Sequence, residues 1–213
     1  MAILTLPATP RYRSARFGLQ SNTLTHVSAL DRTAQTLEFP GAHWMAEFAL
    51  PAMHADGAEA EAWAAKLTEL SGEAGRFYAG DPWRLVPRGS AAVTPGTPLV
   101  NGAAQAGKTL VIDGADPSAA GYLLAGDYAA VDLPSGGRSL HKMTAAVTTD
   151  GSGNATLTIM PPLRESPADG ATILLAPATC VMKLIDDGQA RWQVDEAGFY
   201  TIAFAAVESF NTG

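Results

Sequence analysis

Glycine and proline punctuate this sequence along its whole length, and their spacing is its strongest constraint on the fold. The chain has 21 glycines and 14 prolines among 213 residues. Because both residue types interrupt regular elements, this spacing favours many short strands over a few long helices. Short apolar or alternating runs lie between the interruptions, as in Trp44–Leu50 and Tyr200–Val207, and such runs are typical of β-strands. The sequence therefore predicts a mainly β protein.

One segment departs from this pattern and predicts a helix over residues 57–71. Apolar residues recur there at helical spacing and form one stripe, which includes Trp63 and Leu67. Asp56 is a suitable N-cap, and Glu59 three residues later completes the pattern of a capping box. An amphipathic helix must bury its apolar stripe, so we expect it to pack on the sheet formed by the preceding strands.

A proline-rich stretch from Asp81 to Pro98 has little hydrophobic periodicity, and we expect a domain boundary near residue 88. Residues 1–88 and 177–213 are expected to form a discontinuous β domain, a β-sheet or split barrel carrying the helix. Residues 89–176 are expected to form an inserted small β-barrel or β-sandwich, with strands that include Gly121–Ala125 and Ala155–Met160. The alternative is two sequential domains divided near residue 88.

Composition argues against several classes of function. The net charge is −7 with only 14 lysines and arginines, which disfavours nucleic-acid binding because phosphate neutralisation supplies most of that affinity. No apolar run is long enough to span a membrane. The single cysteine excludes an intramolecular disulfide framework, and the four histidines lack metal-ligand spacing. We therefore expect a protein that is not an enzyme and that uses no metal or cofactor.

The segment Gly102–Thr109 matches the phosphate-binding loop of nucleotidases, including Lys108 before the threonine. That loop functions only between a buried strand and a helix, whose N-terminus contributes to phosphate binding. Here a strand pattern follows the motif, and no alternation of strands and helices surrounds it. We therefore interpret the segment as a loop that leads into a strand.

Two groups of residues are candidates for contacts with other molecules. Arg11, Arg13 and Arg16 form the one basic cluster and would suit an acidic neighbour, such as another copy of this acidic chain. Aromatic side chains would suit stacking on a sugar or another ligand, and the candidates are Trp83, Tyr122 and Tyr128.

A series of short motifs gives the chain a resemblance to a known family. In order, these are Phe39-Pro40-Gly41-x-x-Trp44, Leu50-Pro51-x-Met53, Gly75-Arg76-Phe77, Gly102-Ala103-x-Gln105-x-Gly107, Leu124-x-Ala-Gly126-Asp127-Tyr128 and Ala155-Thr156-Leu157-x-Ile159-x-Pro161-Pro162-Leu163-Arg164. The series resembles the minor tail proteins of long-tailed phages and prophages, of the distal-tail or baseplate-ring family, over nearly the whole chain.

The resemblance implies a structural role at the tip of a virion tail, in a protein made in the host bacterial cytoplasm. Members of the family form a ring, usually a homo-hexamer, that joins the tail tube to the hub and receptor-binding apparatus. The implied partners are other copies of the chain, the tail tube protein, and the hub and tape measure proteins. The alternative function is a carbohydrate- or receptor-binding module, for which a host glycan would be the ligand.

Overall fold

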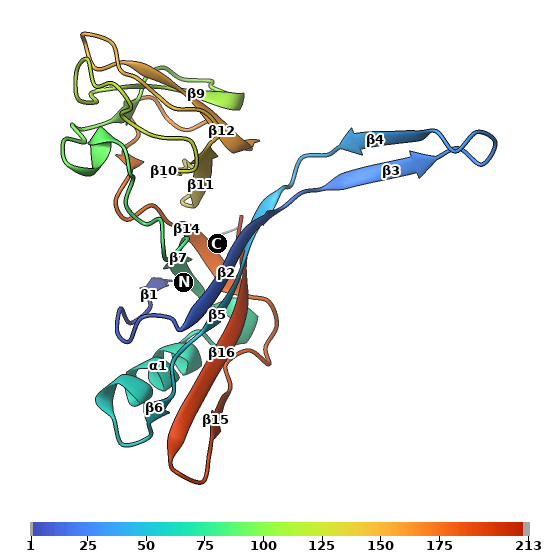
Figure 1. Cartoon of the computed structure of the whole chain (residues 1–213), viewed down its shortest axis with the longest axis vertical. Coiled ribbons are helices and arrows are strands. Elements are labelled where there is room, and N and C mark those ends of the chain that lie inside the picture. The colour runs from blue at the N-terminus through green and yellow to red at the C-terminus, as the bar shows by residue number, and fades with distance from the viewer. Residues whose placement is uncertain (1, 211–213) are drawn as a thin grey trace.

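Strands provide most of the regular structure, as the sequence predicts. The computed structural model describes residues 2–210 and contains an eight-stranded sheet, a six-stranded sheet and a separate two-stranded hairpin (Figure 1). The α-helix found in these residues is α1 (Ala58–Glu69), and two short 3-10 turns occupy Gly72–Ala74 and Ser90–Ala92.

The eight-stranded sheet combines strands from both ends of the chain. Its main path runs β1-β7-β14-β16-β5-β2, and the short strands β6 and β15 pair with β16. The bounds are β1 Ile3–Thr5, β2 Ser14–Gln20, β5 His43–Ala49, β6 Met53–His54, β7 Arg76–Ala79, β14 Cys180–Leu184, β15 Trp192–Val194 and β16 Phe199–Glu208. All its pairs are antiparallel except β1 with β7.

The helix packs on this sheet, as the apolar stripe predicts. Trp63 is fully buried, and its ring centroid lies 6.1 Å from that of Phe204 on β16. Its indole Nε1–H donates to the carbonyl of Thr9 at 3.0 Å, which fixes the N-terminal segment beside the helix.

The predicted capping box does not form. The N-cap is Gly57 in an extended conformation, with no side-chain cap, and Asp56 instead lies 3.7 Å from the imidazole of His54. The N–H of Gly57 donates to the carbonyl of His54, so a tight turn determines where the helix begins. The helix is consequently shorter than the expected range at both ends.

The six-stranded sheet nearly closes into a barrel. Its order is β13-β10-β11-β12-β9-β8, and a bridge between Leu99 and Thr172 joins the two end strands. The bounds are β8 Leu99–Val100, β9 Gly107–Asp113, β10 Tyr128–Asp132, β11 Arg138–Met143, β12 Ala155–Leu163 and β13 Ile173–Leu174. Its interior is a second apolar cluster that includes Ile112, Leu123 and Ile159.

Two expected strands of this region are different in the structure. Residues 121–125 form turns and a single bridge from Leu123 to Val147, because the carbonyls of Gly121 and Tyr122 accept hydrogen bonds from the 3-10 turn at Ser90–Ala92 and are not available to a sheet. Pro161 does not end its strand, since β12 continues to Leu163. The ladder with β9 has an irregular register between Thr158 and Leu163, where the prolines lie, so no ladder bond from a proline nitrogen is needed.

The two sheets use separate parts of the chain. Strands of the eight-stranded sheet lie within residues 3–79 and 180–208, and strands of the other lie within 99–174. Arg88 lies where the chain first passes from one sheet to the other. Its Nε–H donates to the buried carboxylate of Asp127 at 2.9 Å and fixes this connection to the second sheet. The expected division into two domains also concerns independent folding, and it remains a prediction.

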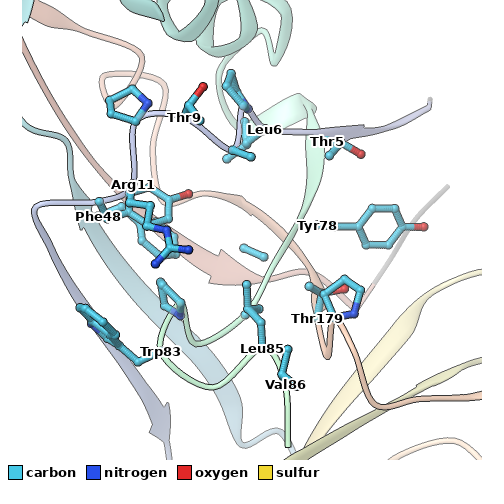
Figure 2. Close-up of a pocket in the computed structure, with 18 of the residues that line it drawn as sticks. Thr5, Leu6, Thr9, Arg11, Phe48, Tyr78, Trp83, Leu85, Val86 and Thr179 are labelled. Carbon is cyan, nitrogen blue, oxygen red and sulfur yellow. The ribbon is translucent and has the colours of Figure 1, made fainter. Parts of the chain in front are cut away.

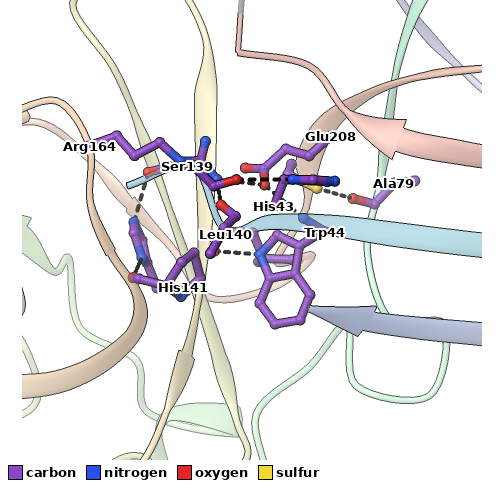
Figure 3. Close-up of polar contacts among 12 residues, drawn as sticks. His43, Trp44, Ala79, Ser139, Leu140, His141, Arg164 and Glu208 are labelled. Carbon is purple, nitrogen blue, oxygen red and sulfur yellow. Dashed lines mark hydrogen bonds and ion pairs between the residues drawn. The ribbon is translucent and has the colours of Figure 1, made fainter. Parts of the chain in front are cut away.

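A buried polar cluster joins the sheets (Figure 3). Trp44 on β5 donates its indole N–H to the carbonyl of Leu140 on β11 at 2.7 Å. Beside it, Arg164 follows β12 and donates to the carboxylate of Glu208 on β16 at 3.1 Å and to the carbonyl of Ala42. Burial raises the pKa of Glu208, and the charge of Arg164 opposes that shift.

His141 on β11 lies in the same region and is held neutral. Its Nδ1 is 2.8 Å from the carbonyl of Pro161, which can only accept, so Nδ1 carries the proton. Its Nε2 then accepts from the hydroxyl of Ser139 at 2.9 Å. Complete burial lowers the pKa of His141 to about 4.

We expect Arg164→Ala to destabilise the protein by about 3 kcal/mol, because it leaves the charge of Glu208 buried and unpaired; the partial exposure of Arg164 places this at the low end for buried pairs. Urea unfolding measures the change. The matched double variant Arg164→Ala/Glu208→Gln removes the buried charge and should recover part of the loss. Additive effects of the two substitutions would contradict the pairing.

The lowered pKa of His141 predicts that the stability of the protein depends on pH. The unfolded chain binds a proton on His141 near pH 6.5, and the folded chain only near pH 4. The free energy of unfolding should therefore fall as the pH is lowered from 6.5 to 4, by about 3 kcal/mol in total. Urea unfolding of wild type and His141→Gln across this range isolates the effect. The raised pKa of Glu208 changes the stability in the opposite direction, but it does so in both proteins. Equal slopes of the free energy of unfolding against pH in the two proteins would contradict the role of His141.

Candidate functional site

A two-stranded hairpin extends away from both sheets (Figure 1). It consists of β3 (Thr23–Val27) and β4 (Ala34–Glu38), and every residue of the two strands is exposed. We call residues 23–38 the arm. Leu24 and Leu37 are paired across the strands and are 60% and 58% exposed, and Leu30 in the connecting turn is 99% exposed.

The arm has little to stabilise it within one molecule. Its ladder is supplemented by a 3.0 Å contact between the hydroxyls of Thr25 and Thr36. At its base, the Lys108 ammonium lies 3.3 Å from the Glu38 carboxylate, and an exposed pair of this kind contributes little. An isolated two-stranded hairpin is only marginally stable in water, so an arm with exposed leucines is suited to burial against another molecule.

A groove of about 890 Å³ lies beside the N-terminal segment (Figure 2). Figure 2 shows Leu6 and Thr9 on one rim, Trp83 and Val86 on the other, and Arg11 between them. The groove is mostly apolar, and five separate parts of the chain contribute to it. Its lining residues are Thr5–Tyr12, Phe48, Tyr78–Gly80, Pro82, Trp83, Leu85, Val86, Arg138, Pro177 and Thr179.

The charged side chains that line the groove are both arginines. Arg138 is neutralised by Asp132 at 2.7 Å, and its guanidinium lies 4.5 Å from the ring centroid of Tyr78. Arg11 is exposed and forms no ion pair with the other residues of the 2–210 range. The groove therefore combines apolar walls with one available positive charge, in a chain whose net charge is −7.

The structure separates the three arginines of the predicted basic cluster. Arg11 lines the groove, whereas Arg16 on β2 lies 3.6 Å from Glu47 in another shallow depression of the sheet. Arg13 is exposed next to β2, and its backbone N–H donates to Ala49. Arg11 is thus the member of the cluster that lines the larger groove.

Burial contradicts the stacking role predicted for two of the three aromatic candidates. Tyr122 is fully buried, its hydroxyl donates to the carbonyl of Pro95 at 2.5 Å, and burial raises its pKa to about 12. Tyr128 is 2% exposed and packs its ring 5.6 Å from that of Trp44. Both tyrosines fill the cores of the sheets and cannot stack on a ligand. Trp83 is 76% exposed at the groove and remains a candidate.

The segment that resembles a phosphate-binding loop connects β8 to β9, so a strand follows it, as expected. The side chain of Gln105 bonds within the loop: its amide donates to Asn101 at 2.8 Å, and its carbonyl accepts from Val111 at 2.7 Å. Lys108 points to Glu38 of the arm. No helix N-terminus is present at this loop, and the geometry does not form a phosphate site.

Other site chemistries find no support in the described chain. Among residues 2–210, no group of three or more His, Cys, Asp or Glu side chains is arranged to hold a metal ion. Within the same range, no helix has the length and apolar character needed to cross a membrane. Cys180 is buried, and burial raises the pKa of its thiol well above the usual range.

Comparisons with known proteins do not identify a family. No protein-family model matches the sequence, and no curated protein matches it significantly. The arm, the groove and the sequence motifs are therefore the features from which a function can be inferred.

The different exposure of the aromatic candidates gives a direct prediction. Tyr122→Ala should lower the free energy of unfolding by about 3–5 kcal/mol, because it empties a fully buried site. Trp83→Ala should leave it almost unchanged, since that side chain is mostly in solvent. Urea unfolding of the two variants measures both values, and a large loss for Trp83→Ala would contradict the exposed position.

Proposed function

We propose that this protein is a structural component of a phage or prophage tail, a distal tail protein whose copies form a ring at the tip of the tail tube. The observation that carries the proposal is the arm, which extends from the body and exposes Leu24, Leu30 and Leu37. Exposed leucines of this kind are stabilised in an assembly, because a neighbouring molecule removes them from water.

The architecture is consistent with this role. A sheet with one packed helix would form the ring, and the nearly closed six-stranded sheet would face outward as the second domain. The proposed neighbours are further copies of the chain, the tail tube protein, and the hub and tape measure proteins. These identities rest on the resemblance carried by the sequence motifs, and the location proposed with them is the tip of a virion tail.

A second candidate function is binding of a host carbohydrate or receptor. The observation that favours it is Trp83, an exposed indole at the edge of a groove that also contains Arg11. Indole faces are suitable platforms for sugar rings. The burial of Tyr122 and Tyr128 leaves this function with one of its three proposed aromatics.

The mass of the purified chain in solution tests the first proposal. Light scattering after size exclusion, over a range of concentrations, should give a discrete closed oligomer, most simply a hexamer, and electron microscopy should show rings. A monomer of 22.1 kDa at all concentrations would count against the ring and favour a binding module.

A glycan array tests the second function. Wild type should bind a defined set of glycans, and Trp83→Ala should lose them without loss of stability. Val93→Ala is the matched control, because Val93 is also highly exposed but does not line the groove. Absence of binding by wild type would contradict this function.

A further inference from the structure

We propose that the arm of one copy docks in the groove of a neighbouring copy, with Leu30 inserted between the groove walls and Asp31 beside Arg11. This inference rests on the proposed ring and identifies the contact that closes it. The occupant of the groove is a second copy of this chain.

The arm and the groove lie on opposite sides of the body. In Figure 1 the arm extends to the right, whereas the N-terminal segment that lines the groove lies at the left, beyond β2 and β5. One molecule therefore cannot place its own arm in its own groove. Each copy can therefore insert its arm into one neighbour and receive the arm of another neighbour in its groove.

The two surfaces match in chemistry. The tip of the arm carries Leu30, which is almost fully in solvent, and a groove walled by Leu6, Leu85 and Val86 would remove it from water. The groove volume of about 890 Å³ is at the upper end of ordinary ligand pockets, large enough for a turn rather than a single side chain.

The charges also match. Asp31 follows Leu30, and hydrogen bonds from the Ser28 and Thr33 side chains lower the pKa of its carboxyl, so it is charged at neutral pH. Arg11 in the groove is positively charged and forms no ion pair within residues 2–210. Two chains of net charge −7 repel one another overall, so a local pair of opposite charges would select this orientation.

A contact between two different surfaces propagates from head to tail. Such contacts generate a ring if the rotation between copies closes, and an open filament if it does not. The arm also gains support that it lacks in one molecule, because its exposed leucines become part of an interface. Assembly and ordering of the arm are thus coupled.

Cysteine cross-linking tests the contact. Leu30 is 99% exposed and Val86 is 53% exposed, so cysteine at either position should leave the fold intact. A chain carrying both Leu30→Cys and Val86→Cys, treated with a short bis-maleimide, should give a ladder of covalent multimers on a denaturing gel. Each single variant should give dimers at most, since it has one reactive site. Cys180 is fully buried and should not react.

The matched control is the double variant Leu30→Cys/Val93→Cys, in which the second cysteine is at least as accessible as at Val86 but lies outside the groove. It should give no ladder. A ladder from this control, or none from the Leu30/Val86 pair, would overturn the contact. Rings seen without the expected ladder would leave the ring proposal standing and remove the arm from it. A ladder in open filaments would support the contact and count against a closed ring.

A second measurement does not need cross-links. Leu30→Ala should raise the concentration for half-maximal assembly about tenfold, because most of a buried leucine side chain is lost from the interface. Val93→Ala should change it by less than about twofold, as expected for a surface substitution that makes no interface. Trp83→Ala should act like Leu30→Ala, and equal effects of all three would overturn the proposal. A carbohydrate that competes with assembly would assign the groove to a glycan instead.

Discussion

The packing of Trp44 against the second sheet is the interaction on which the arrangement of the molecule depends. Its indole closes the first core and donates to the backbone of Leu140 in the other sheet, and Arg164 with Glu208 lies alongside. Tyr128, Ala130 and Leu140 of the six-stranded sheet belong to the same apolar cluster as Trp44. The sheets therefore share one buried boundary.

Much of the fold could be predicted from local pattern, because alternation and turn residues act over a few positions. The strands β5 and β16, the helix stripe around Trp63 and the mainly β class follow from such patterns. The errors arose where distant contacts decided the outcome. Residues 121–125 are apolar enough for a strand, but their carbonyls bond to the turn at Ser90–Ala92. The capping error is local instead: Asp56 has the right spacing for a cap, but the turn from His54 to Gly57 makes Gly57 the N-cap.

The candidate site was predicted less completely for the same reason. Exposure cannot be read from residue type alone, so Tyr122 and Tyr128 were candidates beside Trp83 although both lie in cores. The groove unites segments that are far apart in sequence, and only the density of proline and aromatic residues around positions 78–87 hinted at it. Two extended stretches, Leu24–Leu30 and Thr33–Phe39, can be read from the sequence of the arm. Its projection away from both sheets depends instead on how few packing partners it has in the rest of the described chain.

The strand order has a consequence for biosynthesis. β14 and β16 occupy the middle of the eight-stranded sheet, between β7 and β5, although they are its last long strands along the chain. The first strands to leave the ribosome thus have no central neighbours until almost the whole chain has emerged. The six-stranded sheet uses a continuous stretch, residues 99–174, and all its strands are available earlier. During synthesis the barrel-like sheet can form first, while β7 and β5, which can pair early with β1 and β2 on one side only, keep their other edges exposed to other chains.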